Sequence, residues 1–162
     1  FEETRRSHLA VVLSTALADY DDPAELELAI SVAGSLGLQA LREERDVTLL
    51  VQGQTIRART GGQMLDDLTR LGLVERGGRL AELAREVGEQ IPDASAAVLL
   101  YGATVPPALV HLAGTRLPID VRSLAIRCVP GAPVGRRALG DLTTIDLGDL
   151  ADLPSVMRRV EA

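Results

Sequence analysis

The sequence predicts an α/β fold: a doubly wound, mostly parallel six-stranded sheet with one antiparallel edge strand, in a Rossmann-like three-layer arrangement. Apolar runs with the length of strands alternate along the 162 residues with segments that have helical spacing. The first of these runs, residues 8–14, is apolar almost throughout, as expected for a strand in a sheet that is covered on both faces. One pair of strands is joined by only two residues and is therefore antiparallel.

The elements follow one another in a regular order. Asp22 and Pro23 are a cap and a first helical residue, so they predict a helix that runs to about Glu44. Further helices are expected after Gly62, over residues 79–91, from Pro106 and over residues 150–162, and further strands at residues 95–101, 120–129 and 143–147. Residues 131–142 are expected to form a loop or a ragged helical turn.

The hairpin distinguishes between two α/β folds. Residues 47–51 form the second strand, and Gly53 with Gln54 makes a tight turn into Thr55–Arg59. Two residues cannot hold the crossover helix that keeps these strands parallel in a dinucleotide-binding domain. Thr55–Arg59 is therefore predicted to be an antiparallel strand, and its polar composition suits the edge of the sheet.

We expect one domain over residues 1–162 that is a piece of a longer protein, because the chain begins at Phe1 without an initiator methionine. Residues 94–114 form the longest weakly charged stretch, and its length would suit a membrane span. Pro106 and Pro107 lie in its middle, so we expect a strand, a turn and a helix there. No direct membrane insertion by this part of the chain is expected.

Composition weighs against several functions. The net charge of −6 disfavours a nucleic-acid partner, which requires a basic surface. The single cysteine, Cys128, forms no internal disulfide and is interpreted as a buried, inert thiol. His8 and His111 have no second ligand at metal-binding spacing, so structural or surface roles are favoured for both.

Two segments carry a resemblance to a known family. "FEETRRSHLAVVLS" and "ELELAISVAGSLGLQALREERDVTLLV" resemble the C-terminal half of the bacterial domain-of-unknown-function family 58. The parallel sheet, the hairpin and the "TGG" at residues 60–62 resemble the plan of a von Willebrand factor type A domain. The resemblance covers Phe1 to Tyr101 well. It implies a non-catalytic protein-interaction module, with a MoxR-type AAA+ ATPase as partner in assembly or maturation. It also implies a membrane-anchored parent protein, with the anchor upstream of Phe1 and this domain on the cytoplasmic face of the inner membrane.

The resemblance also directs attention to a metal site. Type A domains typically bind a divalent cation where the first strand ends, through carboxylate and hydroxyl oxygens. The matching positions of this chain are Ser14, Ala16, Ala18, Gln63, Tyr101 and Gly102. None of them is a carboxylate, and a single hydroxyl cannot replace the set. We therefore predict a degenerate metal-ion-dependent adhesion site that binds no metal and no cofactor.

A rim of polar residues remains as the candidate partner-binding site. It consists of Ser14, Thr15, Asp19, Gln63 and Tyr101. One alternative concerns Asp19, which could rebuild a cation site if its loop folds back toward Ser14. Asp19 is the first residue of the run "DYDD", and the favoured interpretation of this run is a solvated loop with a helix cap.

The alternative function is a hydrolase or nucleotide-binding enzyme that uses the crevice at the strand ends, where open α/β sheets usually bind ligands. The sequence offers little for it. "AGSLG" is one residue short of the nucleophile-elbow pattern and lies within a predicted helix. "TGGQM" lacks the lysine of a phosphate-binding loop. No catalytic residue is predicted.

Overall fold

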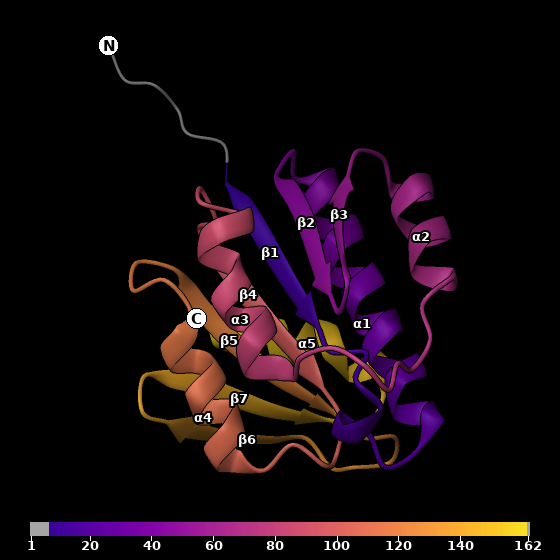
Figure 1. The fold of residues 1–162 in the computed structure, drawn as a ribbon, viewed down its shortest axis with the longest axis vertical. Coiled ribbons are helices and arrows are strands. Elements are labelled where there is room, and N and C mark those ends of the chain that lie inside the picture. The colour runs from indigo at the N-terminus through magenta and orange to yellow at the C-terminus, as the bar shows by residue number, and fades with distance from the viewer. Residues whose placement is uncertain (1–6, 162) are drawn as a thin grey trace.

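The computed structural model describes residues 7–161. Its strands form a single sheet, which is covered by helices (Figure 1). The strands are β1 (His8–Leu13), β2 (Asp46–Val51), β3 (Gln54–Ala58), β4 (Ala96–Tyr101), β5 (Arg122–Cys128), β6 (Gly135–Leu139) and β7 (Leu142–Leu147). The helices are α1 (Pro23–Arg42), α2 (Gly61–Thr69), α3 (Leu80–Gln90), α4 (Pro107–Arg116) and α5 (Leu153–Glu161), with short 3-10 helices at Leu17–Asp19 and Leu150–Asp152. Residues 1–6, with which the family resemblance begins, lie outside the described residues.

The sheet confirms the predicted fold class. Its strand order is β3-β2-β1-β4-β5-β7-β6, and β2, β1, β4, β5 and β7 are parallel neighbours. β3 is antiparallel to β2 and lies at the edge, as the two-residue turn predicts. The strand order reverses between β1 and β4, which makes the carboxyl ends of these two strands the switch point of the sheet.

The number of strands was predicted wrongly. The sheet has seven strands, because β6 lies within the segment that was expected to be loop or helical turn. β6 is antiparallel to β7 and forms a second edge, with Gly140 at a φ of 61° in the tight turn between them. Its middle residues are exposed, so "GRRAL" shows none of the apolar alternation that marks a half-buried strand.

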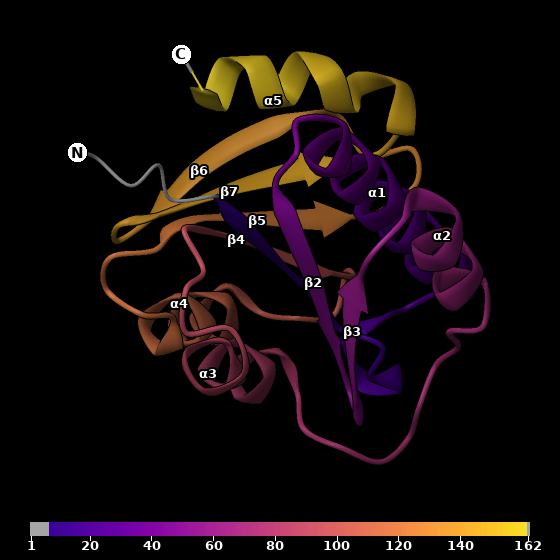
Figure 2. The ribbon, with the colours of Figure 1, turned by 90° about the horizontal axis from the view of Figure 1, so that it is seen from above.

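The helices form two layers. Figure 2 shows α3 and α4 on one face of the sheet and α1 and α5 on the other. Each face has its own apolar core: Val11, Leu49 and Ile126 point toward α1 and α5, and Val12, Leu50 and Leu99 point toward α3 and α4. Such alternation within strands that are buried on both faces explains their unbroken apolar sequences.

The local start signals work as predicted. Asp22 caps α1, because its Oδ1 accepts a hydrogen bond from the backbone N–H of Ala24 at 2.7 Å, and Pro23 is the first helical residue. Residues 94–114 form β4 and most of α4, so the predicted strand, turn and helix are confirmed.

Within the described residues, only α1 is long and apolar enough to cross a membrane, and 44% of that window is buried in the molecule. A core helix passes the same test, and this one packs on the sheet.

Candidate functional site

The centre of the carboxyl edge is a buried carboxylate. The 3-10 helix after β1 turns the chain back so that Asp19 is 0% exposed, and its Oδ2 accepts a hydrogen bond from Ser14 Oγ at 2.6 Å. Its Oδ1 accepts a hydrogen bond from Arg79 Nε at 2.7 Å and forms an ion pair with Arg79 Nη2 at 2.5 Å. A buried carboxylate is costly unless it is paired and hydrogen-bonded, and these contacts meet both needs.

Arg79 supplies the positive charge beside Asp19. Asp19 does fold back to Ser14, which is the arrangement left open by the sequence, but its charge is balanced by the guanidinium of Arg79. Within residues 7–161, no group of three or more His, Cys, Asp or Glu side chains is placed to hold a metal ion. Arg79 comes from the loop between α2 and α3, so the ion pair ties that loop to the end of β1.

Gln52 ties the end of β2 to the same cluster. Its Oε1 accepts hydrogen bonds from the backbone N–H of Thr15 at 2.6 Å and from Thr15 Oγ1 at 2.9 Å. Its Nε2 donates to Ser14 Oγ at 3.1 Å and to the Gly78 carbonyl at 3.0 Å. The amide thus satisfies both hydroxyls and also holds the α2–α3 loop.

The protein's own side chains fill the switch point, where the carboxyl ends of β1 and β4 lie. Tyr20 is 6% exposed and its hydroxyl donates to the Ser14 carbonyl, while Glu25 accepts from the Ala103 backbone N–H at 2.7 Å. Burial raises the pKa of Tyr20 well above its ordinary value, which keeps the hydroxyl a donor. A Cβ at Gly102 would lie 2.6 Å from both the Asp19 carbonyl and Glu25 Oε1, so only glycine fits there.

Tyr101 ends β4 beside this cluster and is 2% exposed. It lines a cavity of about 410 Å³ between β4, β7 and the start of α4, together with Arg127, Arg137 and Asp146. Arg137 Nη2 lies 3.3 Å from Asp146 Oδ2, and Arg127 Nη1 lies 3.9 Å from Asp146 Oδ1. Burial raises the pKa of the Tyr101 phenol, and the nearby Asp146 carboxylate adds to the rise, so Tyr101 is a poor base at neutral pH.

Gln63 does not belong to this edge, and its predicted place on the rim was wrong. The start of β2 pairs with the end of β3, Val47 with Ala58, so the chain leaves β3 at the amino edge of the sheet. There Gln63 helps to cap α2: its N–H donates to Thr60 Oγ1 at 3.2 Å, and its Oε1 accepts from the Arg59 N–H at 2.9 Å.

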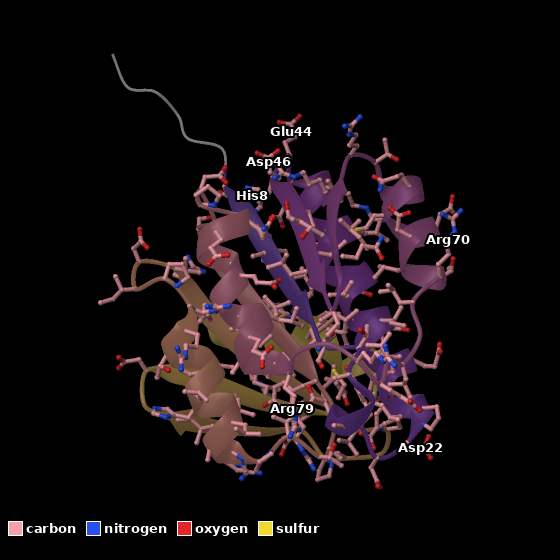
Figure 3. The ribbon with its side chains drawn as sticks, viewed as in Figure 1. His8, Asp22, Glu44, Asp46, Arg70 and Arg79 are labelled. Carbon is pink, nitrogen blue, oxygen red and sulfur yellow. The ribbon has the colours of Figure 1, made fainter. Side chains whose placement is uncertain are left out.

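The four predicted residues that do meet at the carboxyl edge are buried. Ser14, Thr15, Asp19 and Tyr101 are each no more than 2% exposed. Such buried side chains cannot themselves form a contact surface for a partner, which corrects the direct role predicted for them; they hold the loops around them in place. The exposed groups over them include Leu17, which is 43% exposed, Thr104, and the Arg79 side chain at 40%. Figure 3 shows Arg79 at this end of the molecule and His8, Glu44 and Asp46 at the opposite end.

The exposed loop residues are also anchored by hydrogen bonds. Thr104 Oγ1 donates to the Ala18 carbonyl at 2.6 Å, and the Leu17 N–H donates to the Val74 carbonyl at 2.8 Å. Ala16 and Val74 form a parallel bridge, so backbone as well as side chains join the loops after β1 and α2. The carboxyl edge is therefore a preorganised surface.

The two remaining sequence candidates have structural roles. Cys128 is fully buried, and burial raises the pKa of its thiol to about 12, so the reactive thiolate is scarce at neutral pH. His8 Nδ1 lies 2.9 Å from Asp93 Oδ1 and His8 Nε2 lies 2.8 Å from Thr48 Oγ1, which joins three segments at the amino edge.

Three residues of the cluster, Arg79, Gln52 and Glu25, are not among the site residues predicted from the sequence. Arg79 is sixty positions from Asp19, and nothing local marks it as the partner. Gln52 could have been found, because it directly follows a predicted parallel strand and so must lie at the carboxyl edge. Glu25 is in the first turn of α1, a place that also suits an ordinary capping residue.

Comparison with known proteins supports the fold. No family model matches the sequence, and no curated protein matches it. Proximal thread matrix protein 1 from the mussel byssus is similar in structure, with a TM-score of 0.58 and 10% identity over 96% of this chain and 47% of that chain. This chain thus spans about half the length of that protein. The VWA domain of SpRpn10 aligns with 78% of this chain and 90% of its own, with 11% identity and a TM-score of 0.45. The first likeness shows a shared fold, and the second is too low to add to it.

Proposed function

We propose that this chain is a non-catalytic protein-interaction module of the von Willebrand factor type A kind, and that its partner contacts the loops at the carboxyl edge. The observation that supports this best is the buried Asp19–Arg79 pair. It joins the loops after β1 and α2 and leaves Leu17 and Arg79 partly exposed above them. A rigid surface with an apolar side chain and a guanidinium is suited to a protein partner, since neither group has to be ordered on binding.

The finer parts of the proposal rest on the sequence resemblance. They are membership of the bacterial domain-of-unknown-function family 58, a MoxR-type AAA+ ATPase as the partner, and a place at the cytoplasmic face of the inner membrane with the anchor upstream. In this proposal the metal-ion-dependent adhesion site is degenerate and an internal arginine has replaced the ion.

A photo-crosslinking amino acid tests the surface in the cells that make the parent protein. It is placed at Leu17, with Leu65 on α2 as the matched control, because the two side chains are 43% and 40% exposed. The expected result is a defined protein adduct from position 17 and none from position 65, and mass spectrometry then shows whether the captured protein is a MoxR-type ATPase. An absence of adducts at position 17, or equal adducts at both positions, would contradict the proposed surface.

The enzyme alternative retains one supporting observation, the cavity beside Tyr101. Arg127 and Arg137 line it and could attract an anionic substrate, although both lie near Asp146. A panel of nucleotides and phosphate esters tests it directly. Turnover that is abolished by Arg127→Ala would favour the enzyme over the interaction module.

A further inference from the structure

A second surface of the molecule lies between two helices and borders the cluster described above, because Asp19 and Arg79 are among its lining residues. α3 and α4 lie side by side on one face of the sheet (Figures 1 and 2). The groove between them has a volume of about 530 Å³ and reaches Arg79 at its inner end. Figure 3 shows Arg79 close to the ends of these two helices.

The floor of this groove is apolar. Leu109 and Leu112 lie one turn apart on α4 and both line the groove, while Val110 and Ala113 of the same helix are buried toward the sheet. Leu112 is 37% exposed, although it is a large apolar side chain. Leu109 is partly buried against the core, so Leu112 is the large apolar side chain of α4 that its own fold leaves exposed.

The sides of the groove are basic. Arg85 on α3 and Arg116 on α4 line it and are exposed, and neither forms an ion pair within residues 7–161. Of the two carboxylates in the groove, Asp19 is paired with Arg79, whereas Glu82 is exposed, so the three arginines of the lining outnumber its two acidic residues by one. The α4 sequence "PALVHLAGTR" contains no acidic residue. Two guanidinium groups thus remain available beside an apolar floor.

The charge of the groove differs in sign from the net charge of the protein, and this difference favours an acidic partner at the groove. The protein has a net charge of −6, so an acidic partner is repelled by most of its surface. At the groove an acidic segment finds arginines, which form charge-assisted hydrogen bonds with carboxylates. The groove has no aromatic residue on which a base could stack, so its apolar floor suits protein better than nucleic acid.

We infer that the α3–α4 groove is the docking site for an acidic, amphipathic segment of a protein partner, whose apolar side chains cover Leu109 and Leu112 and whose carboxylates pair with Arg85 and Arg116. This inference rests on the proposed function, because it presumes that the chain binds protein. It adds the place and the chemistry: a helix-in-groove contact with anchors at helical spacing.

A displayed library of random peptides tests the inference without knowledge of the partner. Peptides of about fifteen residues are long enough to follow α4 as a helix. The library is selected against the purified domain, and the enriched peptides are synthesised and titrated by fluorescence anisotropy. The expected consensus combines two or more Asp or Glu residues with Leu, Ile or Phe, and binding weakens as ionic strength rises.

Matched variants locate the binding. Leu112→Asp and Arg116→Glu are expected to weaken the selected peptides about tenfold each, as for contacts at the centre of an interface. Leu65→Asp and Arg70→Glu on α2 make the same changes at comparably exposed positions and should leave the affinity within about twofold. Leu112→Ala and Arg116→Ala serve as milder variants, and urea unfolding checks that each variant is folded.

Three results would overturn the inference: no enriched peptide, a basic or uncharged consensus, or equal effects of the groove and control variants. Oligonucleotide binding that depends on Arg116 would do so as well. These outcomes differ from failure of the proposed function. If position 17 captures a partner in cells while the groove variants change nothing, only the groove inference is wrong.

Discussion

The two ends of the sheet hold the same kinds of side chain in opposite surroundings. At the carboxyl end, Asp19 is fully buried and binds Arg79, Ser14 and no solvent. At the amino end, the Asp93 side chain is 68% exposed and binds His8. An exposed pair is screened by water and contributes little, whereas removal of one partner from a buried pair leaves a charge without compensation. Burial, and not the number of ion pairs, therefore decides which end depends on its charges for stability.

The largest effect is expected from removing Arg79, the cation that pairs with the buried Asp19 carboxylate. Arg79→Ala leaves the Asp19 carboxylate buried without its partner and should lower the free energy of unfolding by about 3 kcal/mol. Urea denaturation measures this. Arg70→Ala is the matched control, because Arg70 Nη1 lies 3.9 Å from Asp67 Oδ1 and its side chain is 79% exposed; a loss below about 0.5 kcal/mol is expected there.

A double variant separates charge from packing. Asp19→Asn added to Arg79→Ala removes the uncompensated charge and should restore much of the lost stability. If Arg79→Ala and Arg70→Ala cost the same, the carboxyl end is not held by its ion pair.

The next effect comes from the close approach at Gly102. Gly102→Ala places a methyl group against Tyr20, Glu25 and the Asp19 carbonyl, and should cost about 2 kcal/mol through overpacking. Gly62→Ala in α2 is the control, since a Cβ there meets no atom within 4 Å, and it should leave stability unchanged or slightly higher. Thermal unfolding of both variants distinguishes them; equal midpoints would show that the switch point is not tightly filled.

A smaller, pH-dependent effect is expected at the amino end. The hydrogen bond from His8 lowers the pKa of the Asp93 carboxyl from its ordinary value of 3.8. A carboxyl whose pKa is lower in the folded state contributes stability above its unfolded pKa and loses it as pH falls through the folded value. Asp93→Asn should therefore reduce stability slightly near neutral pH. The difference from the unaltered protein should shrink as pH falls below 3.8 and vanish only below the lowered pKa of the folded state. Urea midpoints measured from about pH 2 to about pH 7 check this.

Divalent cations are expected to have no effect on stability. Millimolar Mg²⁺, Ca²⁺ or Mn²⁺ should leave the thermal midpoint unchanged relative to chelator, because the Asp19 carboxylate already binds Arg79. Binding to the folded state alone would raise stability by about 2.7 kcal/mol at a hundredfold excess over Kd. A reproducible rise with one ion, abolished by Ser14→Ala or Asp19→Ala, would show that the site still holds a cation.

The sequence predicts the fold well where the signal is local. The two-residue turn at Gly53 and the cap at Asp22 each depend on a few neighbouring residues, and both are confirmed. β6 was missed because an exposed edge strand has no apolar period. The misplacement of Gln63 was avoidable, since a strand antiparallel to β2 necessarily returns the chain to the amino edge.

The site was harder to predict than the fold. Its central contact joins Asp19 to Arg79, which are separated along the chain by α1, β2, β3 and α2, and only the assembled sheet brings them together. Residue types that suggested an accessible rim, such as Ser14 and Thr15, are buried, because their hydroxyls find partners inside the protein. Hydrogen-bonding capacity is visible in a sequence, but whether water or protein satisfies it is not.

The antiparallel strands at both edges of the sheet have a consequence for aggregation. β1 and β4 are uncharged, largely apolar runs of the kind that assemble into fibrils when they are exposed. In the folded chain each has a neighbour on both sides, while the outermost strands present Arg57 on β3 and Arg136 on β6. Charges on an edge strand disfavour the addition of a strand from another molecule. We therefore expect the folded protein to stay soluble at high concentration and the refolding chain, before β3 and β6 have docked, to be the species that aggregates.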